Sequence, residues 1–188
     1  MSVLVEFSPD TPQGSISPDL NLSKLWLCQE LDEMGLTQFD TVYILGSWYG
    51  SMSMFLVNKH IVFDHCYCID WDREKTEWLA HGLKRMHMNN KIHAIRGDVN
   101  DIVYKGESIL VINTSTNDIA GREWLSRIPP GSVVVLQGRD HQADSNGIET
   151  LESFDQAYSL SETLLLDHLV LTGVDDDIYT RFMKIGIR

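Results

Sequence analysis

The sequence predicts an α/β protein built on an open, mostly parallel sheet of seven strands, with helices on both faces. Two observations lead to this doubly wound fold class. Runs of β-forming residues alternate with helical or turn-rich segments along residues 41–158, which is typical of a parallel sheet. The last two β-like runs, 164–172 and 179–187, are joined by a link too short for a parallel crossover. We therefore expect the sheet to end in an antiparallel hairpin.

Each predicted strand is a short apolar or alternating run bounded by turn residues. The seven runs are 41–45, 65–70, 92–96, 108–113, 132–137, 164–172 and 179–187. Helices are expected from Ser23, as the cap, to about Met34, after Gly50, and over 72–86, 119–127 and 149–158. The link 99–107 has room for about one helical turn.

The chain length fits one domain, because 188 residues can bury a self-sufficient core. Residues 1–21 are rich in Pro, Ser and Gly and are expected to form an N-terminal arm without a core of its own. Residues 22–188 are expected to form the single folded domain, since no linker or internal repeat divides them.

The composition is that of an acidic globular protein. Lys and Arg number 15 against 27 Asp and Glu, which gives a net charge of -12 and disfavours nucleic acid as a partner. Three cysteines without metal-ligand spacing suggest buried thiols in a reducing compartment. No secretory signal and no apolar run long enough for a membrane are evident, so we expect a cytoplasmic location.

The strongest local motif joins the first strand to a tight loop and a helix. Residues 41–45 run into Gly46-Ser47-Trp48-Tyr49-Gly50, and helical spacing follows. Such a loop presents backbone N–H groups to a ligand at the carboxyl end of a strand. Trp48 and Tyr49 are candidates for lining the ligand pocket, or alternatively for aromatic packing beneath the loop.

The acid that ends the second strand indicates which ligand this loop binds. Asp70 lies twenty positions after Gly50, where a carboxylate accepts both hydroxyls of a ribose. NAD and S-adenosylmethionine both meet that requirement. The loop lacks the G-x-G-x-x-G pattern, and Trp48 and Tyr49 occupy positions where a pyrophosphate needs close backbone approach. These residues, with the terminal hairpin, favour S-adenosylmethionine.

Over about residues 22–188 the chain resembles a class I S-adenosylmethionine-dependent methyltransferase, Rossmann-like and without a substrate-binding cap. Residues 42–50 resemble the family's first motif, and Ile69-Asp70-Trp71-Asp72 is similar to its ribose-binding segment. The resemblance of 96–99 implies that Asp98 meets the adenine amine and that the backbone N–H of Val99 meets the ring. Residues 130–135 and 179–182 resemble the family's strands five and seven.

Two departures from the family pattern bear on function. Leu45 replaces the usual acid at the end of strand one, and Trp48 replaces the middle glycine, which leaves open how the methionine amino group is held. Asn113-Thr114-Ser115-Thr116 stands where DNA adenine and glutamine methyltransferases carry Asn-Pro-Pro-Tyr, which argues against those activities.

Candidate catalytic residues follow strands four and five. The resemblance places Asn113 beside the transferred methyl, where its side chain could hold a nucleophile; the alternative is a strand-end Asn that closes a turn. His141 could accept a proton from the substrate, or be a surface loop histidine. For Asp98 the alternative to adenine contact is a Gly-Asp turn. Residues 175–177 are interpreted as a solvated hairpin turn, so no metal site is expected.

The predicted function is methyl transfer from S-adenosylmethionine to a small-molecule or protein acceptor. Two alternatives stay open: other chemistry on the same cofactor, such as cleavage or aminopropyl transfer, and an inactive cofactor-binding module, which the missing acid at Leu45 supports. With no cap domain, the acceptor pocket is expected to draw on the N-terminal arm, the loop 138–147 and a second subunit of a homo-oligomer.

Overall fold

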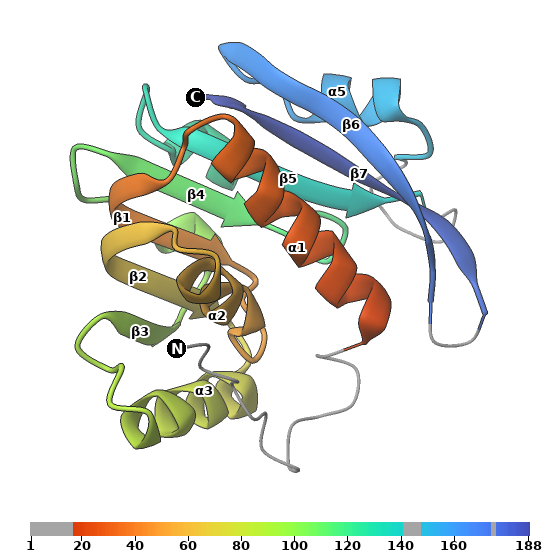
Figure 1. Ribbon diagram of the computed structural model, residues 1–188. Helices are drawn as coiled ribbons and strands as arrows, with labels where there is room; N and C mark the ends of the chain where they lie inside the picture. The colour runs from red at the N-terminus through yellow and green to blue at the C-terminus, as the bar shows by residue number, and fades with distance from the viewer. Residues whose placement is uncertain (1–16, 141–147, 174–175) are drawn as a thin grey trace.

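The computed structural model describes residues 17–140, 148–173 and 176–188, and its centre is a seven-stranded sheet of order β3-β2-β1-β4-β5-β7-β6 (Figure 1). The strands are β1 Gln38–Leu45, β2 Val62–Asp70, β3 Ile92–Arg96, β4 Ile109–Asn113, β5 Val133–Arg139, β6 Glu162–Thr172 and β7 Ile178–Ile187. Neighbours among β1 to β5 pair in parallel, and β7 is antiparallel to both β5 and β6. The predicted fold class is therefore confirmed.

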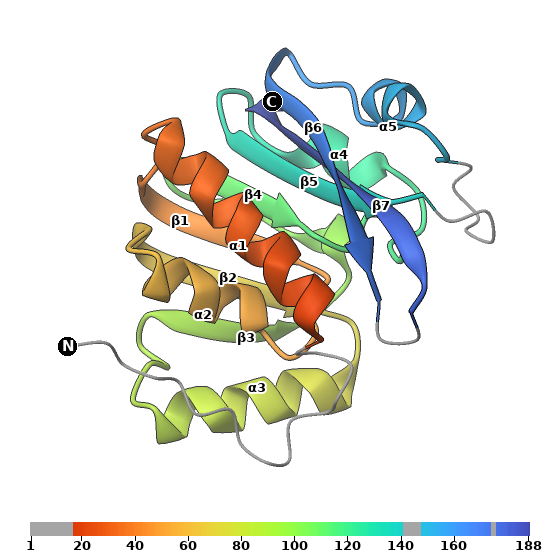
Figure 2. The same cartoon turned by 45° about the vertical axis from the view of Figure 1, so that its right-hand side comes forward.

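Helices cover both faces of this sheet (Figure 2). They are α1 Pro18–Glu33, α2 Ser51–Asn58, α3 Arg73–Arg85, α4 Glu123–Arg127 and α5 Leu151–Ala157, with a 3-10 turn, η2, at Val99–Asp101. The turn η2 is the single helical turn expected between β3 and β4.

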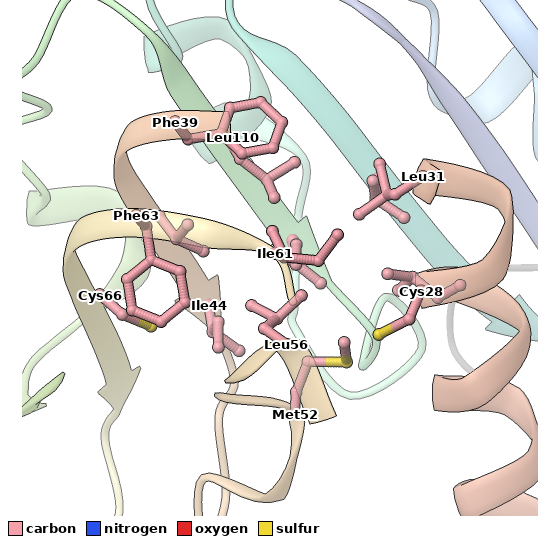
Figure 3. Packing of buried hydrophobic residues seen from close by; sticks show 14 of the residues in the cluster. Cys28, Leu31, Phe39, Ile44, Met52, Leu56, Ile61, Phe63, Cys66 and Leu110 are labelled. Atoms are coloured by element: carbon pink, nitrogen blue, oxygen red, sulfur yellow. The ribbon is translucent and has the colours of Figure 1, made fainter. Parts of the chain in front are cut away.

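The core has two halves because side chains of a strand point alternately to opposite faces. Val42 and Ile44 of β1 pack with α1, α2 and α3, and Figure 3 shows part of that half, with Leu31, Met52 and Leu56. Side chains of opposite parity, such as Leu45, pack with α4 and α5. Cys28, Cys66 and Cys68 are buried free thiols, as expected, and burial raises the pKa of the Cys66 thiol well above its usual range.

The first helix begins five residues earlier than Ser23, the predicted cap. It starts at Pro18 because proline suits the first helical position, where no N–H is needed, and Ser17 precedes it as the N-cap residue. Residues 18–21 of the predicted arm are therefore helical, and residues 1–16 lie outside the described part of the chain.

The fourth helix is shorter than the predicted 119–127 and begins only at Glu123. Gly121 has a φ of 72°, a left-handed conformation that interrupts a right-handed helix. Ile119 instead packs near Gly46, where a Cβ would lie 3.3 Å from its Cδ1. Across the described ranges, no helix combines the length and the apolar character needed to span a lipid bilayer.

An ion pair between a buried lysine of β7 and a half-exposed aspartate of α5 supports a stability prediction. Lys184 Nζ lies 2.5 Å from Asp155 Oδ1, and the Lys184 side chain is only 3% exposed. We expect Asp155→Ala to lower the free energy of unfolding by about 2–3 kcal/mol, because the ammonium stays buried without its partner. Urea denaturation measures the loss. Glu77→Ala is the control, since its pair with Arg73 is exposed and should change stability by less than about 0.5 kcal/mol.

Candidate functional site

The loop between β1 and α2 is shaped by its two glycines. Gly46 and Gly50 have φ values of 63° and 73°, in the left-handed region that favours glycine. The Ser47 N–H donates to the carbonyl of Ile69 on β2 at 2.9 Å, and the Gly50 N–H donates to the Ser47 carbonyl at 2.8 Å. A Cβ on Gly46 would lie 3.2 Å from Ser115 Cβ, so this loop and the loop after β4 approach closely.

Gly50 also fixes the distance between the loop and α3, which supports a second stability prediction. A Cβ added there would lie 2.5 Å from Leu79 Cδ1, in addition to the unfavourable φ. We expect Gly50→Ala to cost about 2–4 kcal/mol in unfolding free energy, from backbone strain and overpacking together. Thermal denaturation compares this variant with Gly82→Ala. Gly82 lies in α3, and no neighbouring atom would come within 4 Å of a Cβ added there. Equal stability of the two variants would contradict the packing argument.

Asp70 lies at the end of β2, beside this loop, and is only 3% exposed. Its Oδ2 accepts the Trp48 backbone N–H at 2.7 Å and its Oδ1 accepts the Asp72 N–H at 2.9 Å. A carboxylate offers about four acceptor positions, so both oxygens keep capacity for further donors. Asp70 thus anchors the loop of β1 to the end of β2, and its predicted ribose contact stays a prediction.

The aromatic residues of this region differ in their surroundings. Trp48, with a φ of 52°, lines a cavity beside this loop, and the Lys75 ammonium lies 5.2 Å from its ring centre. Tyr49 packs edge-on against Trp78 of α3 at 5.3 Å between ring centres, which is the packing role considered as its alternative. Trp71 is 79% exposed beside Asp70.

Asp98 and Val99 follow β3, next to the end of β2. The Gly97 N–H donates to the Asp70 carbonyl at 3.0 Å, so these two strand ends adjoin. Asp98 is exposed and its Oδ1 accepts the Asn100 N–H at 2.8 Å, which forms the local turn named as its alternative. The structure therefore brings the predicted nucleoside-binding residues to one edge of the sheet.

Asn113, at the end of β4, is fully buried. Its Oδ1 accepts the Ser115 N–H at 2.9 Å, the turn-closing contact expected of a strand-end Asn. Its Nδ2 has no hydrogen-bond partner in the described part of the chain. Asn113 therefore fixes the backbone of the loop after β4, whose residues Thr114 and Ser115 line the cavity described below.

Two predicted features fall partly outside the described residues. His141, the candidate base, lies outside them, as does Asp175 of the acidic turn. Asp176 and Asp177 are exposed, in keeping with a solvated turn. Among residues 17–140, 148–173 and 176–188 no cluster of three or more His, Cys, Asp or Glu side chains could hold a metal ion.

A cavity of about 370 Å³ lies at the carboxyl ends of the strands, between α1, the loops after β1 and β4, and the ends of β5 and β7. Its described lining is Leu20, Ser23, Lys24, Ile44, Gly46, Ser47, Trp48, Ser51, Met52, Thr114, Ser115, Asn117, Asp118, Arg139 and Arg181. Its size is within the range of small-molecule sites. Its charged side chains are three cations, Lys24, Arg139 and Arg181, and the carboxylate of Asp118.

A buried hydrogen-bond network forms one wall of the cavity and explains Ser23. Its Oγ donates to Gln137 Oε1 at 2.9 Å and accepts Arg181 Nε at 3.1 Å, so Ser23 joins α1 to β5 and β7 instead of capping the helix. Arg181 Nη2 donates to the Thr114 carbonyl at 2.5 Å. Burial lowers the pKa of Arg181 to about 10, against attraction from Tyr179 and Asp118.

The cations Lys24, Arg139 and Arg181 are the functional candidates that the sequence analysis missed. A weak signal exists for Arg181, because a charged residue stands next to Phe182 in an otherwise buried strand. Nothing local distinguishes Lys24 from the solvent-facing lysines of other helices. Only the packing of α1 on the sheet brings it beside β7.

No family model and no curated protein sequence matches the chain. Among solved structures, a protein of Pyrococcus horikoshii proposed to be an RNA methyltransferase has a TM-score of 0.63 at 17% identity, over 94% of this chain and 86% of its own. An S-adenosylmethionine-dependent methyltransferase from Aquifex aeolicus has a TM-score of 0.60 at 13% identity, over 96% and 99%.

A third match is a methyltransferase from Thiobacillus denitrificans in complex with S-adenosyl-L-homocysteine, with a TM-score of 0.50 at 19% identity, over 73% of this chain and 56% of the other. At these identities the likeness establishes the fold. The chain therefore has the fold of S-adenosylmethionine-dependent methyltransferases, as the sequence resemblance implied.

Proposed function

We propose that this protein binds S-adenosylmethionine and transfers its methyl group to a small-molecule or protein acceptor. The main support is the geometry at the end of β2. There a buried acid, Asp70, is hydrogen-bonded to the glycine-bounded loop of β1, and that loop also lines the 370 Å³ cavity. The proposal is supported by this contact between the acid and a loop that lines a small-molecule cavity, in a fold shared with enzymes of this activity.

The residues present fit this cofactor. Asp70 has acceptor capacity for ribose hydroxyls, and Asp98 and Val99 lie at the neighbouring strand end for the adenine. Leu45, which replaces the family's acid, is fully buried in the core and is not available to the methionine amino group. The cavity instead supplies Asp118 as a carboxylate for that ammonium.

When bound, S-adenosylmethionine would supply an electrophilic methyl group: the acceptor's lone pair forms a bond to the methyl carbon, and the electron pair of the broken S–C bond remains on sulfur. Because the leaving group is neutral, the task of the protein is mainly alignment and exclusion of water. Asn113 contributes by holding the Thr114–Ser115 backbone at the cavity wall, and His141 is proposed as the group that takes a proton from the acceptor.

Calorimetric titration with S-adenosylmethionine and S-adenosylhomocysteine tests the proposal. We expect both to bind with micromolar affinity. Absence of binding by either at high micromolar concentration would reject the proposed function. Incubation of the protein with S-adenosylmethionine alone, followed by chromatography, should leave the cofactor intact; breakdown without an acceptor would instead indicate a cofactor-cleaving enzyme.

A further inference from the structure

The cavity has a charge opposite to that of the protein as a whole. The chain carries a net charge of -12, whereas the described lining has three cations and one carboxylate, a net of +2. Asp19 lies nearby on α1, but its Oδ2 accepts the Tyr179 hydroxyl at 2.7 Å. Even with Asp19 included the net is +1. The described lining of this cavity is therefore cationic, although the protein as a whole is acidic.

Lys24 is buried, and among the described residues no carboxylate forms an ion pair with it. It is 7% exposed, and its Nζ donates to the Leu20 carbonyl at 3.3 Å. No carboxylate lies within ion-pair distance of its Nζ in residues 17–140, 148–173 and 176–188. An ammonium buried in this way is costly unless an anion pairs with it. The lack of an ion-pair partner for Lys24 among the described residues therefore suggests that an anionic ligand pairs with it.

Arg181 is held rigidly beside Lys24. It is 6% exposed, and its bonds to Ser23 and Thr114 fix the guanidinium plane through Nε and Nη2. Arg139 lies opposite Arg181 in the β5–β7 register, and its guanidinium stacks 5.1 Å from the ring centre of Tyr179. A fixed guanidinium with a neighbouring ammonium suits the oxygens of a carboxylate or phosphate.

The strand order places these cations away from the predicted nucleoside residues. Asp70 and Asp98 follow β2 and β3, on one side of β1, while Arg139 and Arg181 lie on β5 and β7, on its other side and beyond β4. A ligand on the cations would therefore lie on the other side of β1 from the predicted nucleoside residues, where we expect the acceptor.

We propose that the methyl acceptor is a small organic anion, whose carboxylate or phosphate binds Lys24 and Arg181 in this cavity, with Arg139 at its rim. The inference rests on the proposed function and names the acceptor class for the same site. A small molecule is favoured over a nucleic-acid backbone because Lys24 and Arg181 are recessed, whereas a polymer contacts exposed cations. The anionic group orients the acceptor and need not be the atom that is methylated.

The test titrates benzoate, phenyl phosphate and neutral benzamide into the complex with S-adenosylhomocysteine, and also into the free protein. We expect at least one anion to bind more than tenfold tighter than benzamide, and Lys24→Met and Arg181→Gln to remove at least tenfold of that affinity. Lys59→Met is the charge-matched control, since Lys59 is exposed outside the cavity, and it should change nothing. Benzoate and phenyl phosphate distinguish the two anionic groups.

Three results would overturn the proposal. Equal affinity for the anions and benzamide would remove the anion site. If folded Lys24→Met keeps the anion affinity of the wild type, the anion binds at a site other than Lys24. A tenfold loss of S-adenosylhomocysteine affinity in Lys24→Met, with unchanged affinity for 5′-methylthioadenosine, would assign the cations to the cofactor's own carboxylate. Failure of S-adenosylhomocysteine to bind the wild type would reject the proposed function, while titration of the free protein still tests the anion site.

Discussion

Replacement of Asp70 by alanine is expected to weaken S-adenosylhomocysteine binding by about 100-fold, because two ribose hydrogen bonds to a charged acceptor contribute on the order of 3 kcal/mol together. The same substitution removes the acceptor for the Trp48 and Asp72 N–H groups, so the loop of β1 loses its attachment to β2. Calorimetry of the folded variant, with circular dichroism to verify folding, measures the loss.

Two further variants serve as comparisons for Asp70→Ala. Asp70→Asn keeps one acceptor oxygen and should retain an intermediate affinity. Asp72→Ala removes the N-cap of α3, which accepts the N–H groups of Glu74 and Lys75, and should cost about 1 kcal/mol of stability with no change in affinity. Unchanged affinity in Asp70→Ala would refute the ribose assignment.

Lys24→Met is expected to raise the free energy of unfolding at pH 7 by about 2–3 kcal/mol. Burial, with repulsion from Arg181, lowers the pKa of Lys24 to about 8 from 10.5, against attraction from Asp19; Arg139 and Asp118 line the same cavity. A pKa difference of this size corresponds to about 3 kcal/mol between the two protonation states. Methionine keeps the apolar stem and removes the buried charge.

The stability advantage of Lys24→Met over the wild type should depend on pH. Between pH 8 and 10.5 the unfolded chain binds more protons at Lys24 than the folded chain does. The wild type therefore gains stability from this group as pH rises through that window, and the full penalty is present below it. The advantage of Lys24→Met should be largest at pH 7 and small by pH 10.5.

Urea denaturation of both proteins at several pH values measures that difference. Lys59→Met should differ from the wild type by less than about 0.5 kcal/mol at every pH, because Lys59 is exposed. A Lys24→Met variant that is less stable than the wild type at pH 7 would mean that the ammonium is already compensated in the folded chain. That result would also weaken the argument for an anionic ligand.

Errors in the predicted elements arose where distant contacts override local pattern. Ser23 has the residue type of a helix cap, but a buried network with Gln137 and Arg181 uses its hydroxyl instead. The helix predicted from Ile119 fails because Gly121 adopts a left-handed conformation and the chain before it packs against the loop of β1. The residues that contact Ser23, and the loop of β1 that Ile119 approaches, are far from these segments in sequence, whereas the conformation of Gly121 is a local cause.

The sequence by itself determined the order of strands and helices, the terminal hairpin, the loop from Gly46 to Gly50, the acid that ends β2 and the acid that follows β3. These features follow from short-range patterns: alternation of apolar residues, glycines that bracket a loop and polar residues at strand ends. Parallel pairing then brings the strand ends to one edge, so their proximity was predictable as well.

The cationic cavity forms only in the tertiary structure. Lys24, Arg139 and Arg181 come from a helix and two strands far apart in the chain, and no periodicity relates them. Their meeting depends on how α1 crosses the sheet and on the register that sets Arg139 opposite Arg181. Because packing and register are long-range properties, the grouping of the proposed nucleoside-binding residues could be predicted from sequence, and the grouping of the cavity's cations could not.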